Sequence, residues 1–190
     1  MKNKIITILT FIGISIMAEA QNKTLVAYFS HTGENYSVGY INKGNTAIVA
    51  EEINKIVKGD LFEIESDRVY SADSYQLCCD QAKEDLNKGL RPKLKKNIDI
   101  SKYDVIYLGY PIWWGTMPMP VFSFIEANGN LKGKTIIPFC THEGSSFGNS
   151  VDDIKKECPE AKVKNGLSIR GSNAKNSKAT VEEFIKKTTK

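Results

Sequence analysis

The chain lacks the short motifs that mark several common kinds of site. The first expected strand is not followed by the G-x-G-x-x-G pattern, which counts against a dinucleotide-binding site. No C-x-x-C pair and no metal-spaced set of cysteine and histidine is present, which counts against structural zinc. The four cysteines are Cys78, Cys79, Cys140 and Cys158. A single disulfide between Cys158 and either Cys78 or Cys79 is left open.

A strong charge of one sign is also missing. The 190 residues include 26 basic and 22 acidic side chains, and 24 and 21 remain without Lys2, Lys4 and Glu19 of the N-terminal segment. The resulting net charge of +3 is too small to indicate binding to nucleic acid or to a membrane surface. The contents of 41% hydrophobic and 25% charged residues are those of a globular protein, and the length suits one domain.

The first twenty residues have the pattern of a secretory signal peptide. Lys2 and Lys4 precede an apolar stretch at residues 5–17, and residues 18–20 form a small-x-small cleavage site. The stretch is short for a membrane span; an uncleaved anchor and a buried first helix are the alternatives. Neither a twin arginine nor a following cysteine accompanies it, so we expect export by the general route, to the periplasm, with no lipid anchor. The mature domain would cover residues 21–190.

Apolar periodicity in the mature chain predicts alternating strands and helices. Strands are expected at residues 24–30, 61–65, 103–110, 134–141 and 162–170. Helices are expected at residues 45–58, 73–88, 117–127, 147–157 and 180–187, with Asp73 or Ser74 capping the second and Thr180 capping the last. The alternation predicts an α/β fold with a doubly wound, five-stranded parallel sheet and helices on both faces. Five strands favour the order 2-1-3-4-5 over the longer Rossmann order.

Polar and glycine-rich segments surround the start of the first helix. Ser30 and Thr32 follow the first strand, and Asn45 and Thr46 open the helix after a further loop. Backbone N–H groups at a helix start bind phosphate, and these side chains can add hydrogen bonds. A simple helix cap at Asn45 or Thr46 is the alternative for either residue alone. The set predicts an anion-binding site.

Two more unusual loops follow the third and fourth strands. The third strand leads into residues 109–115, where Trp113 and Trp114 are framed by proline and glycine and could form a flat wall for a planar ligand. Adjacent residues rarely face the same way, so one indole is expected to stack on the ligand; Trp114 is favoured, with Trp113 at the rim or beneath it. The loop at residues 141–148 is rich in glycine and serine, which allow close backbone approach to a ligand. His142 within it reads as a hydrogen-bonding residue rather than a catalytic one.

These three loops resemble those of the flavodoxin family, and in particular its branch of short bacterial proteins. The resemblance covers nearly all of residues 23–190 and is carried by residues 28–33, 44–50, 109–115 and 138–148. It implies a flavodoxin-like fold and FMN as cofactor. It also implies that the protein tunes the flavin, with Gly115 as the glycine whose peptide turns near N5 of the ring. No residue is assigned a catalytic role, and no metal site is expected.

The resemblance implies an FMN site built from all three loops. Its phosphate-binding residues would be Ser30, Thr32, Gly33, Asn45 and Thr46, with Asn35 as the alternative to Asn45 because residues 34–44 interrupt the family's compact phosphate loop. One wall of the ring pocket would be Pro111, Ile112, Trp113, Trp114 and Gly115. The other would be Thr141, His142, Gly144, Ser145, Phe147 and Gly148. Glu143 and Ser146 stand where the family is expected to have glycines, which could bring a carboxylate toward the ring.

An exported FMN protein that transfers electrons to a redox partner protein is therefore the favoured function. The first alternative is an FMN-dependent reductase, using NAD(P)H, of quinones or similar small planar acceptors. The second is a degenerate module that binds another phosphorylated planar ligand. Family members that shuttle electrons are strongly acidic, whereas this chain is net basic, so docking to their usual basic partners is not expected. The sequence leaves open the donor, the acceptor, the redox potential and the oligomeric state.

Overall fold

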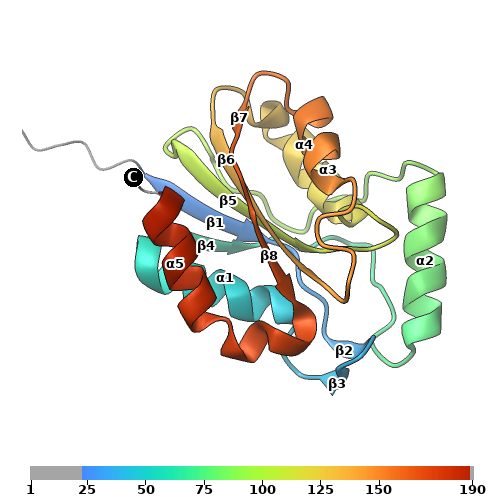
Figure 1. The fold of residues 1–190 in the computed structure, drawn as a ribbon. Coiled ribbons are helices and arrows are strands. Elements are labelled where there is room, and N and C mark those ends of the chain that lie inside the picture. Colours follow the sequence, from blue (N-terminus) through green and yellow to red (C-terminus); the bar gives the residue numbers. More distant parts are fainter. Residues whose placement is uncertain (1–22, 189–190) are drawn as a thin grey trace, which may run out of the picture.

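The computed structural model describes residues 23–188, in which strands and helices alternate to form three layers (Figure 1). The main strands are β1 (Thr24–Tyr28), β4 (Asp60–Glu63), β5 (Val105–Pro111), β6 (Thr135–His142), β7 (Lys162–Val163) and β8 (Leu167–Arg170). The helices are α1 (Asn45–Val57), α2 (Tyr75–Asn87), α3 (Met119–Ala127), α4 (Ser150–Glu157) and α5 (Lys178–Thr188). Two short 3-10 helices span Gly129–Leu131 and Gly171–Asn176. The expected signal peptide lies outside the described residues.

The sheet is parallel and runs in the order β4-β1-β5-β6, with β7 and β8 both pairing with the outer edge of β6. This is the predicted order 2-1-3-4-5, with β7 and β8 together as the last strand. The register places Val26 of β1 between Leu61 of β4 and Tyr107 of β5. The run Leu25–Ala27 is fully buried, which is why it contains no polar residue.

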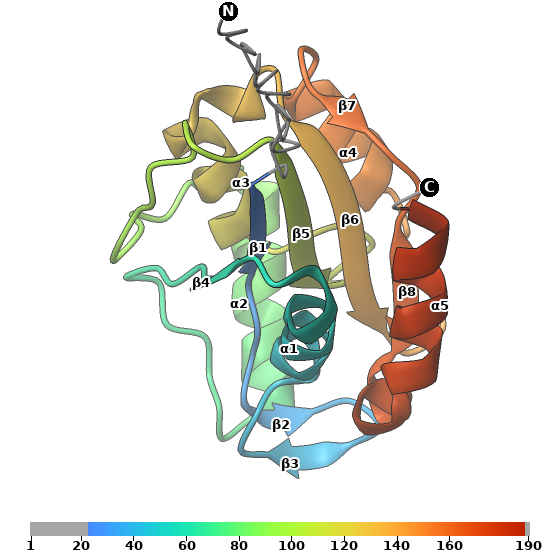
Figure 2. The ribbon, with the colours of Figure 1, turned by 90° about the vertical axis from the view of Figure 1, so that its left-hand side faces the viewer.

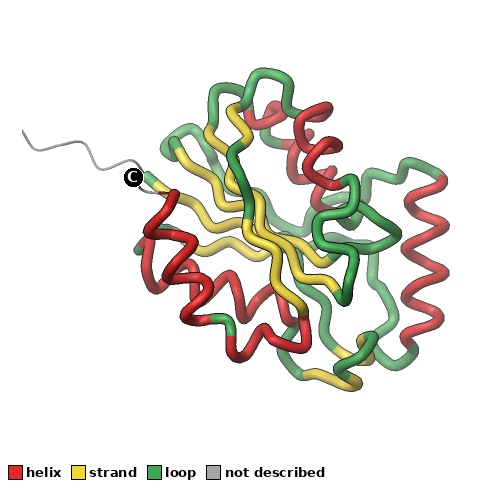
Figure 3. The backbone as a smooth tube through the Cα atoms, viewed as in Figure 1, coloured by secondary structure: helices red, strands yellow, loops and turns green. Residues whose placement is uncertain are grey.

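Helices cover both faces of the sheet, and each face has its own apolar core. On one face α1 and α5 pack together over residues such as Val26, Tyr107 and Phe139. On the other, α3 and α4 cover Leu25, Ile106 and Ile136, with α2 beside α3 (Figure 3). Successive residues of β1, β5 and β6 therefore point to opposite faces of the sheet, as the alternation of side chains along a strand requires.

Two element predictions need correction. The last strand is not continuous at residues 162–170: three residues separate β7 from β8, whereas two separate the matching positions of β6. Pro138 of β6, which has no N–H to donate, lies in this interval, and the extra residue forms a bulge there. The last helix begins at Lys178 rather than at a Thr180 cap, because the 3-10 helix Gly171–Asn176 leads almost directly into it.

The sequence pattern also missed a small antiparallel hairpin, β2 (Gly33–Asn35) and β3 (Gly39–Ile41), between β1 and α1. Figure 2 shows it at the end of the sheet toward which the arrows of β5 and β6 point. Among the described residues all four cysteines are free thiols, so the disulfide that was left open is not formed in this structure. In the same range no helix is long and apolar enough to cross a bilayer.

Candidate functional site

A cleft lies at the carboxyl end of the sheet, between the loops after β1, β5 and β6 and the amino-terminal parts of α1 and α2. It has two adjoining parts: the α1 chamber, of about 230 Å³, and the α2 chamber, of about 350 Å³. The larger has a volume typical of small-molecule sites. The residues that line both chambers are His31, Asn35, Tyr75, Ile112 and Trp113. One ligand can therefore extend through both chambers, or two ligands can meet at the shared wall.

The amino-terminal end of α1 forms a cradle in the α1 chamber. Gly44 caps the helix with no side-chain hydrogen bond, and the N–H groups of Asn45 and Thr46 have no acceptor within residues 23–188. A β-carbon on Gly44 would overlap the Ser30 hydroxyl and the His31 carbonyl oxygen, so only glycine leaves this concave backbone undistorted. Free N–H groups at the positive end of a helix suit a phosphate group.

Side-chain hydroxyls hold this cradle to the rest of the cleft. Ser30 Oγ accepts the N–H of Ala47 at 3.1 Å, which ties the loop after β1 to the first turn of α1. Thr46 is buried, and its hydroxyl lies 2.7 Å from the hydroxyl of Thr141 at the end of β6. The expected phosphate site and the loop after β6 are therefore fixed relative to each other.

The hairpin β2–β3 joins the cradle to helix α2. The N–H of Glu34 donates to the Ala72 carbonyl at 2.7 Å, and the Glu34 carboxylate accepts the first N–H of α2, from Tyr75, at 3.1 Å. A carboxylate at a helix start is stabilised by the helix dipole. At the mouth of the α1 chamber the rings of Tyr36 and Tyr75 lie 5.9 Å apart. The residues that interrupt the phosphate loop thus build one side of the cleft.

The two tryptophans occupy different environments because they flank a tight turn. Trp114 and Gly115 have φ angles of 51° and 82°, and Trp113 and Thr116 exchange backbone hydrogen bonds across them at 2.9 and 3.1 Å. This is the φ signature of a type I′ turn, in which a bulky residue such as Trp114 is rare. The turn points successive side chains in different directions.

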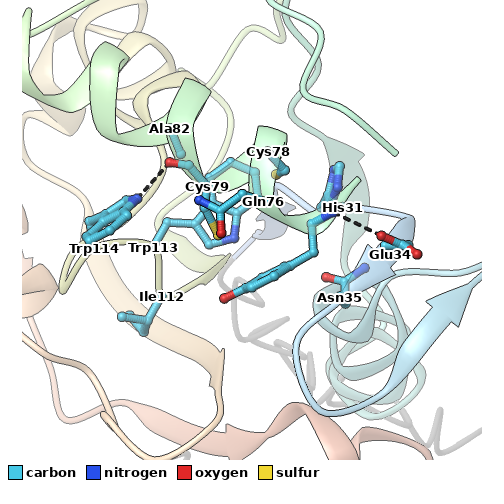
Figure 4. Close-up of a pocket in the computed structure, with 11 residues that line it drawn as sticks. His31, Glu34, Asn35, Gln76, Cys78, Cys79, Ala82, Ile112, Trp113 and Trp114 are labelled. Atoms are coloured by element: carbon cyan, nitrogen blue, oxygen red, sulfur yellow. Dashed lines mark hydrogen bonds between the residues drawn. The ribbon is translucent and has the colours of Figure 1, made fainter. Parts of the chain in front are cut away.

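Trp113 lies in the wall of the cleft. Its ring makes edge contacts with Phe29 at 5.5 Å, His31 at 5.5 Å and Tyr70 at 4.9 Å between centroids. Trp114 instead turns toward α2, where its indole N–H donates to the Cys79 carbonyl at 2.9 Å (Figure 4). Trp113 borders both chambers, whereas Trp114 borders only the α2 chamber. This placement favours Trp113, rather than the Trp114 expected from sequence, as the indole nearest to a ligand that extends through both chambers.

The loops after β5 and β6 are clamped together behind the cleft. The N–H of Asn149 donates to the Gly115 carbonyl at 2.7 Å. Gly148 has a φ of 51°, and a β-carbon there would overlap the Gly115 carbonyl oxygen. Two glycines thus let the loop backbones touch, which fixes the spacing between the two walls of the cleft.

His142 organises the loop after β6. Its Nδ1 accepts the N–H groups of Gly144 at 2.9 Å and Ser146 at 3.1 Å, and its Nε2 lies 2.8 Å from Ser168 Oγ. Because Nδ1 accepts two hydrogen bonds, Nε2 must carry the proton and donate it to Ser168. Burial and the nearby Arg170 lower the pKa of His142, in line with a neutral ring.

The same geometry decides against a serine nucleophile. Residues 144–148 have the G-x-S-x-G spacing of hydrolases, which the sequence reasoning wrongly took to be absent, and Ser146 has a φ of 51°. A nucleophilic serine needs a neighbouring base that can take its proton. Among residues 23–188, Ser146 Oγ reaches only Ser168 Oγ, at 3.0 Å, and the histidine nitrogen beside Ser168 already bears a proton. The arrangement supports loop structure rather than acyl transfer.

Comparison with known proteins identifies the architecture. A model of the flavodoxin family matches residues 23–187. The chain belongs to the flavodoxin family. A protein from Bacteroides uniformis, classed provisionally as a flavoprotein, is 31% identical with a TM-score of 0.71, covering 87% of this chain and 98% of its own. One from Bacteroides eggerthii, classed likewise, is 34% identical with a TM-score of 0.65, covering 84% and 98%.

A third solved structure shows a ligand. The flavoprotein of Lactobacillus acidophilus, determined in complex with FMN, is 25% identical with a TM-score of 0.62, and the alignment covers 82% of this chain and 97% of that one. No curated protein matches the chain.

The structure brings most of the expected flavodoxin-type site residues together. Those that line the cleft are Asn35, Asn45, Thr46, Pro111, Ile112, Trp113, Trp114, Thr141, His142 and Ser145. Those that do not are Ser30, Thr32, Gly33, Gly115, Gly144, Phe147 and Gly148. Ser30, Gly115 and Gly148 shape the cleft through the contacts described above, whereas Phe147 packs against the core. Both candidate asparagines border the α1 chamber, and only Asn45 stands at the free helix end.

Sequence reasoning missed the side of the cleft made by α2. Its lining residues there are Tyr75, Gln76, Cys78, Cys79 and Ala82, together with His31 and Glu34 from the loop after β1. The polar pattern of α2 indicated a surface helix, and no local signal shows that such a helix overhangs a cavity. Within residues 23–188 no group of three or more acidic, histidine or cysteine side chains is placed to hold a metal ion.

Both histidines of this flavodoxin-family chain make its stability depend on pH. Burial is the main cause of a lowered pKa for His31 and for His142, so the folded protein favours both neutral rings. The unfolded chain binds protons near pH 6.5, the ordinary value. The free energy of unfolding should therefore be highest above that pH and fall as the pH drops through 6.5 toward the lowered values.

Thermal unfolding at several pH values between about 5.5 and 7.5 tests this directly. The melting temperature of the unaltered protein should fall as the pH is lowered from about 7.5 to about 5.5. The fall should be smaller in His142→Gln. Equal falls in the two proteins would show that His142 is not held in its neutral form.

Proposed function

We propose that the protein binds FMN in this cleft and transfers electrons. The observation that carries the proposal is the cradle at the start of α1, which opens into a cleft between the loops after β5 and β6. A relative with the same fold, the Lactobacillus acidophilus flavoprotein, was solved with FMN. In this chain the phosphate would lie against the N–H groups of Asn45 and Thr46, and the ring would lie beside Trp113.

The residues of the cleft would bind and orient the flavin, which supplies one- and two-electron chemistry when bound. Ile112 and Trp113 offer an apolar wall, and a ring stacked on an aromatic gains about 0.5–1.5 kcal/mol beyond its area burial. The clamped glycines keep this wall at a fixed distance from the loop after β6. No lysine or arginine lines either described chamber, so backbone N–H groups rather than cationic side chains would hold the phosphate.

The proposal includes export. Residues 1–20 have the basic start, apolar stretch and cleavage site of a signal peptide. The mature protein recovered from the periplasm should begin at Gln21. Recovery of the uncut chain from the cytoplasm would contradict this part of the proposal.

Electron transfer is tested with the FMN-loaded protein. After reduction by dithionite, it should be reoxidised rapidly by a one-electron acceptor, while NADPH with a quinone but no partner protein should produce no steady turnover. Steady NADPH oxidation under those conditions would instead support the reductase alternative. The α2 chamber, with its volume of about 350 Å³, is large enough for a small molecule that accepts electrons from the flavin.

A further inference from the structure

The α2 chamber offers room for a second ligand. Its volume of about 350 Å³ exceeds that of the α1 chamber, and the phosphate cradle does not border it. The two chambers share Ile112 and Trp113, the wall expected to lie against the flavin ring. A molecule in the α2 chamber would therefore be next to that ring, as electron transfer between the two requires.

The lining of this chamber selects for an uncharged, flat molecule. Trp113, Trp114 and Tyr75 supply aromatic surface, and Gln76 supplies an amide that can donate to a carbonyl oxygen. No lysine or arginine is among the described lining residues; Lys83 reaches only the ring of Trp114, at 4.7 Å from its centroid, and the carboxylate of Glu34 already accepts the N–H of Tyr75. An anionic dinucleotide would therefore find no lysine or arginine in the lining, whereas a neutral diketone of one or two rings would lose little on leaving water.

His31 stands at the junction of the two chambers with one nitrogen unused. Its Nε2 lies 3.1 Å from the Ser71 carbonyl, which can only accept, so Nε2 carries a proton. The ring meets Trp113 edge-on, with centroids 5.5 Å apart. No partner of Nδ1 is found in the described part of the chain. This nitrogen is therefore available to a molecule in the cleft.

We propose that the α2 chamber binds a neutral planar acceptor of the quinone class beside the flavin, and that His31 Nδ1 exchanges a proton with it. This rests on the proposed binding of FMN in the α1 chamber. Reduction of a quinone to the hydroquinone takes two electrons and two protons. FMN held in the α1 chamber would, in its anionic two-electron-reduced form, supply both electrons and one of the two protons and return to its oxidised form. The second O–H bond forms as the Nδ1–H bond of protonated His31 breaks, and the neutral ring then takes a proton from water.

The surroundings of His31 give this step a defined pH dependence. Titratable groups face the cleft from β2, from α2 and from the far wall: Glu34, Tyr36, Tyr75, Cys78, Cys79, His142 and Glu143. The pKa of Tyr75 is raised to about 12 by its hydrogen bond to Cys79 and by burial, and burial raises the pKa of Cys78 to about 12, so both stay protonated near neutral pH. Burial lowers the pKa of His31. Since only the protonated ring bears an Nδ1–H, quinone reduction should slow as the pH rises above that lowered value.

One experiment tests the proton-exchanging role of His31. Reduced FMN-loaded protein is mixed in a stopped-flow instrument with tetramethyl-1,4-benzoquinone or with ferricyanide, which takes an electron but no proton. In His31→Gln the ratio of the quinone rate to the ferricyanide rate should fall by about tenfold or more, because general acid catalysis typically contributes a factor of about 10²–10⁴. In the same variant the rate of quinone reduction should no longer depend on pH. An unchanged ratio would overturn the assignment of His31.

A second experiment tests the chamber without turnover. Binding of the oxidised quinone is followed by quenching of tryptophan fluorescence, in both flavin-free and FMN-loaded protein. Gln76→Phe, at an exposed position of α2 that lines the chamber, should raise the Kd for the quinone by about tenfold while leaving the Kd for FMN unchanged. Glu84→Phe, exposed on the same helix but outside the chamber, should change neither.

The outcomes separate this proposal from the proposed function. If Gln76→Phe weakens FMN binding as much as quinone binding, the flavin itself fills the α2 chamber, and the second site is wrong while FMN binding stands. If the unaltered protein binds the quinone but not FMN, the proposed function fails and the chamber assignment survives. Absence of quinone binding by either form would overturn the second site.

Discussion

Replacing Trp113 with alanine should weaken FMN binding by about 1–3 kcal/mol, or a roughly 5- to 150-fold rise in Kd. Trp113 borders both chambers and is the aromatic surface nearest the expected ring position. The substitution also removes three edge contacts, with Phe29, His31 and Tyr70, and should lower the free energy of unfolding by about 2–4 kcal/mol. FMN fluorescence titration and chemical denaturation measure the two effects separately.

Two further variants serve as controls for Trp113→Ala. Trp113→Phe retains an aromatic face and should lose less than half of the binding energy that alanine loses. Trp114 is 51% exposed, and its indole N–H is hydrogen-bonded to α2. Trp114→Ala should therefore change FMN affinity by less than about 0.5 kcal/mol. A larger loss from Trp114→Ala than from Trp113→Ala would show that the ring lies against the other indole.

Replacing Gly44 with alanine should damage both stability and FMN binding. Its backbone is extended, with φ −64° and ψ 146°, so alanine adopts it without strain. The added β-carbon, however, would overlap the Ser30 hydroxyl and the backbone oxygen of His31. We expect overpacking to cost about 1–3 kcal/mol and the displaced hydroxyl about 1 kcal/mol more, as its bond with the Ala47 N–H is lost. The Kd for FMN should rise by about tenfold or more because the phosphate cradle is deformed.

Gly89→Ala provides the matched control. Gly89 follows α2, has open space around it and has a φ of 58°, so alanine there costs only the strain of a left-handed residue, about 1–2 kcal/mol. FMN affinity should not change in this variant. If Gly44→Ala binds FMN as tightly as Gly89→Ala does, the phosphate does not sit at the start of α1.

The sheet could be predicted because each strand carries its own signal. The strand segments at residues 25–29, 106–110 and 136–140 are buried on both faces of the sheet and therefore carry no charged residue. The start of α5 could not be predicted from the sequence, because it depends on the 3-10 helix Gly171–Asn176 that precedes it. The break between β7 and β8 could not be predicted either, because it depends on Pro138 in the neighbouring strand.

One part of the candidate site could be predicted from the sequence and another part could not. The cradle was predictable because Ser30, Gly44 and Thr46 are close in sequence and their residue types suit an anion. The side of the cleft made by α2 could not be predicted. The contact between Glu34 and Tyr75 joins residues that are far apart in the sequence, and Gln76 has no feature that distinguishes it from other polar residues of a surface helix. The different directions of the two indoles depend on the turn at Trp114 and Gly115, which the sequence analysis did not predict.

Titration of the purified domain, residues 21–190, with FMN tests the central claim most directly. The account predicts saturable quenching of FMN fluorescence with one flavin per chain, a shifted visible absorption band, and a Kd that rises in Trp113→Ala and Gly44→Ala but not in Gly89→Ala. A flavin spectrum that stays that of free FMN at every protein concentration would contradict the account.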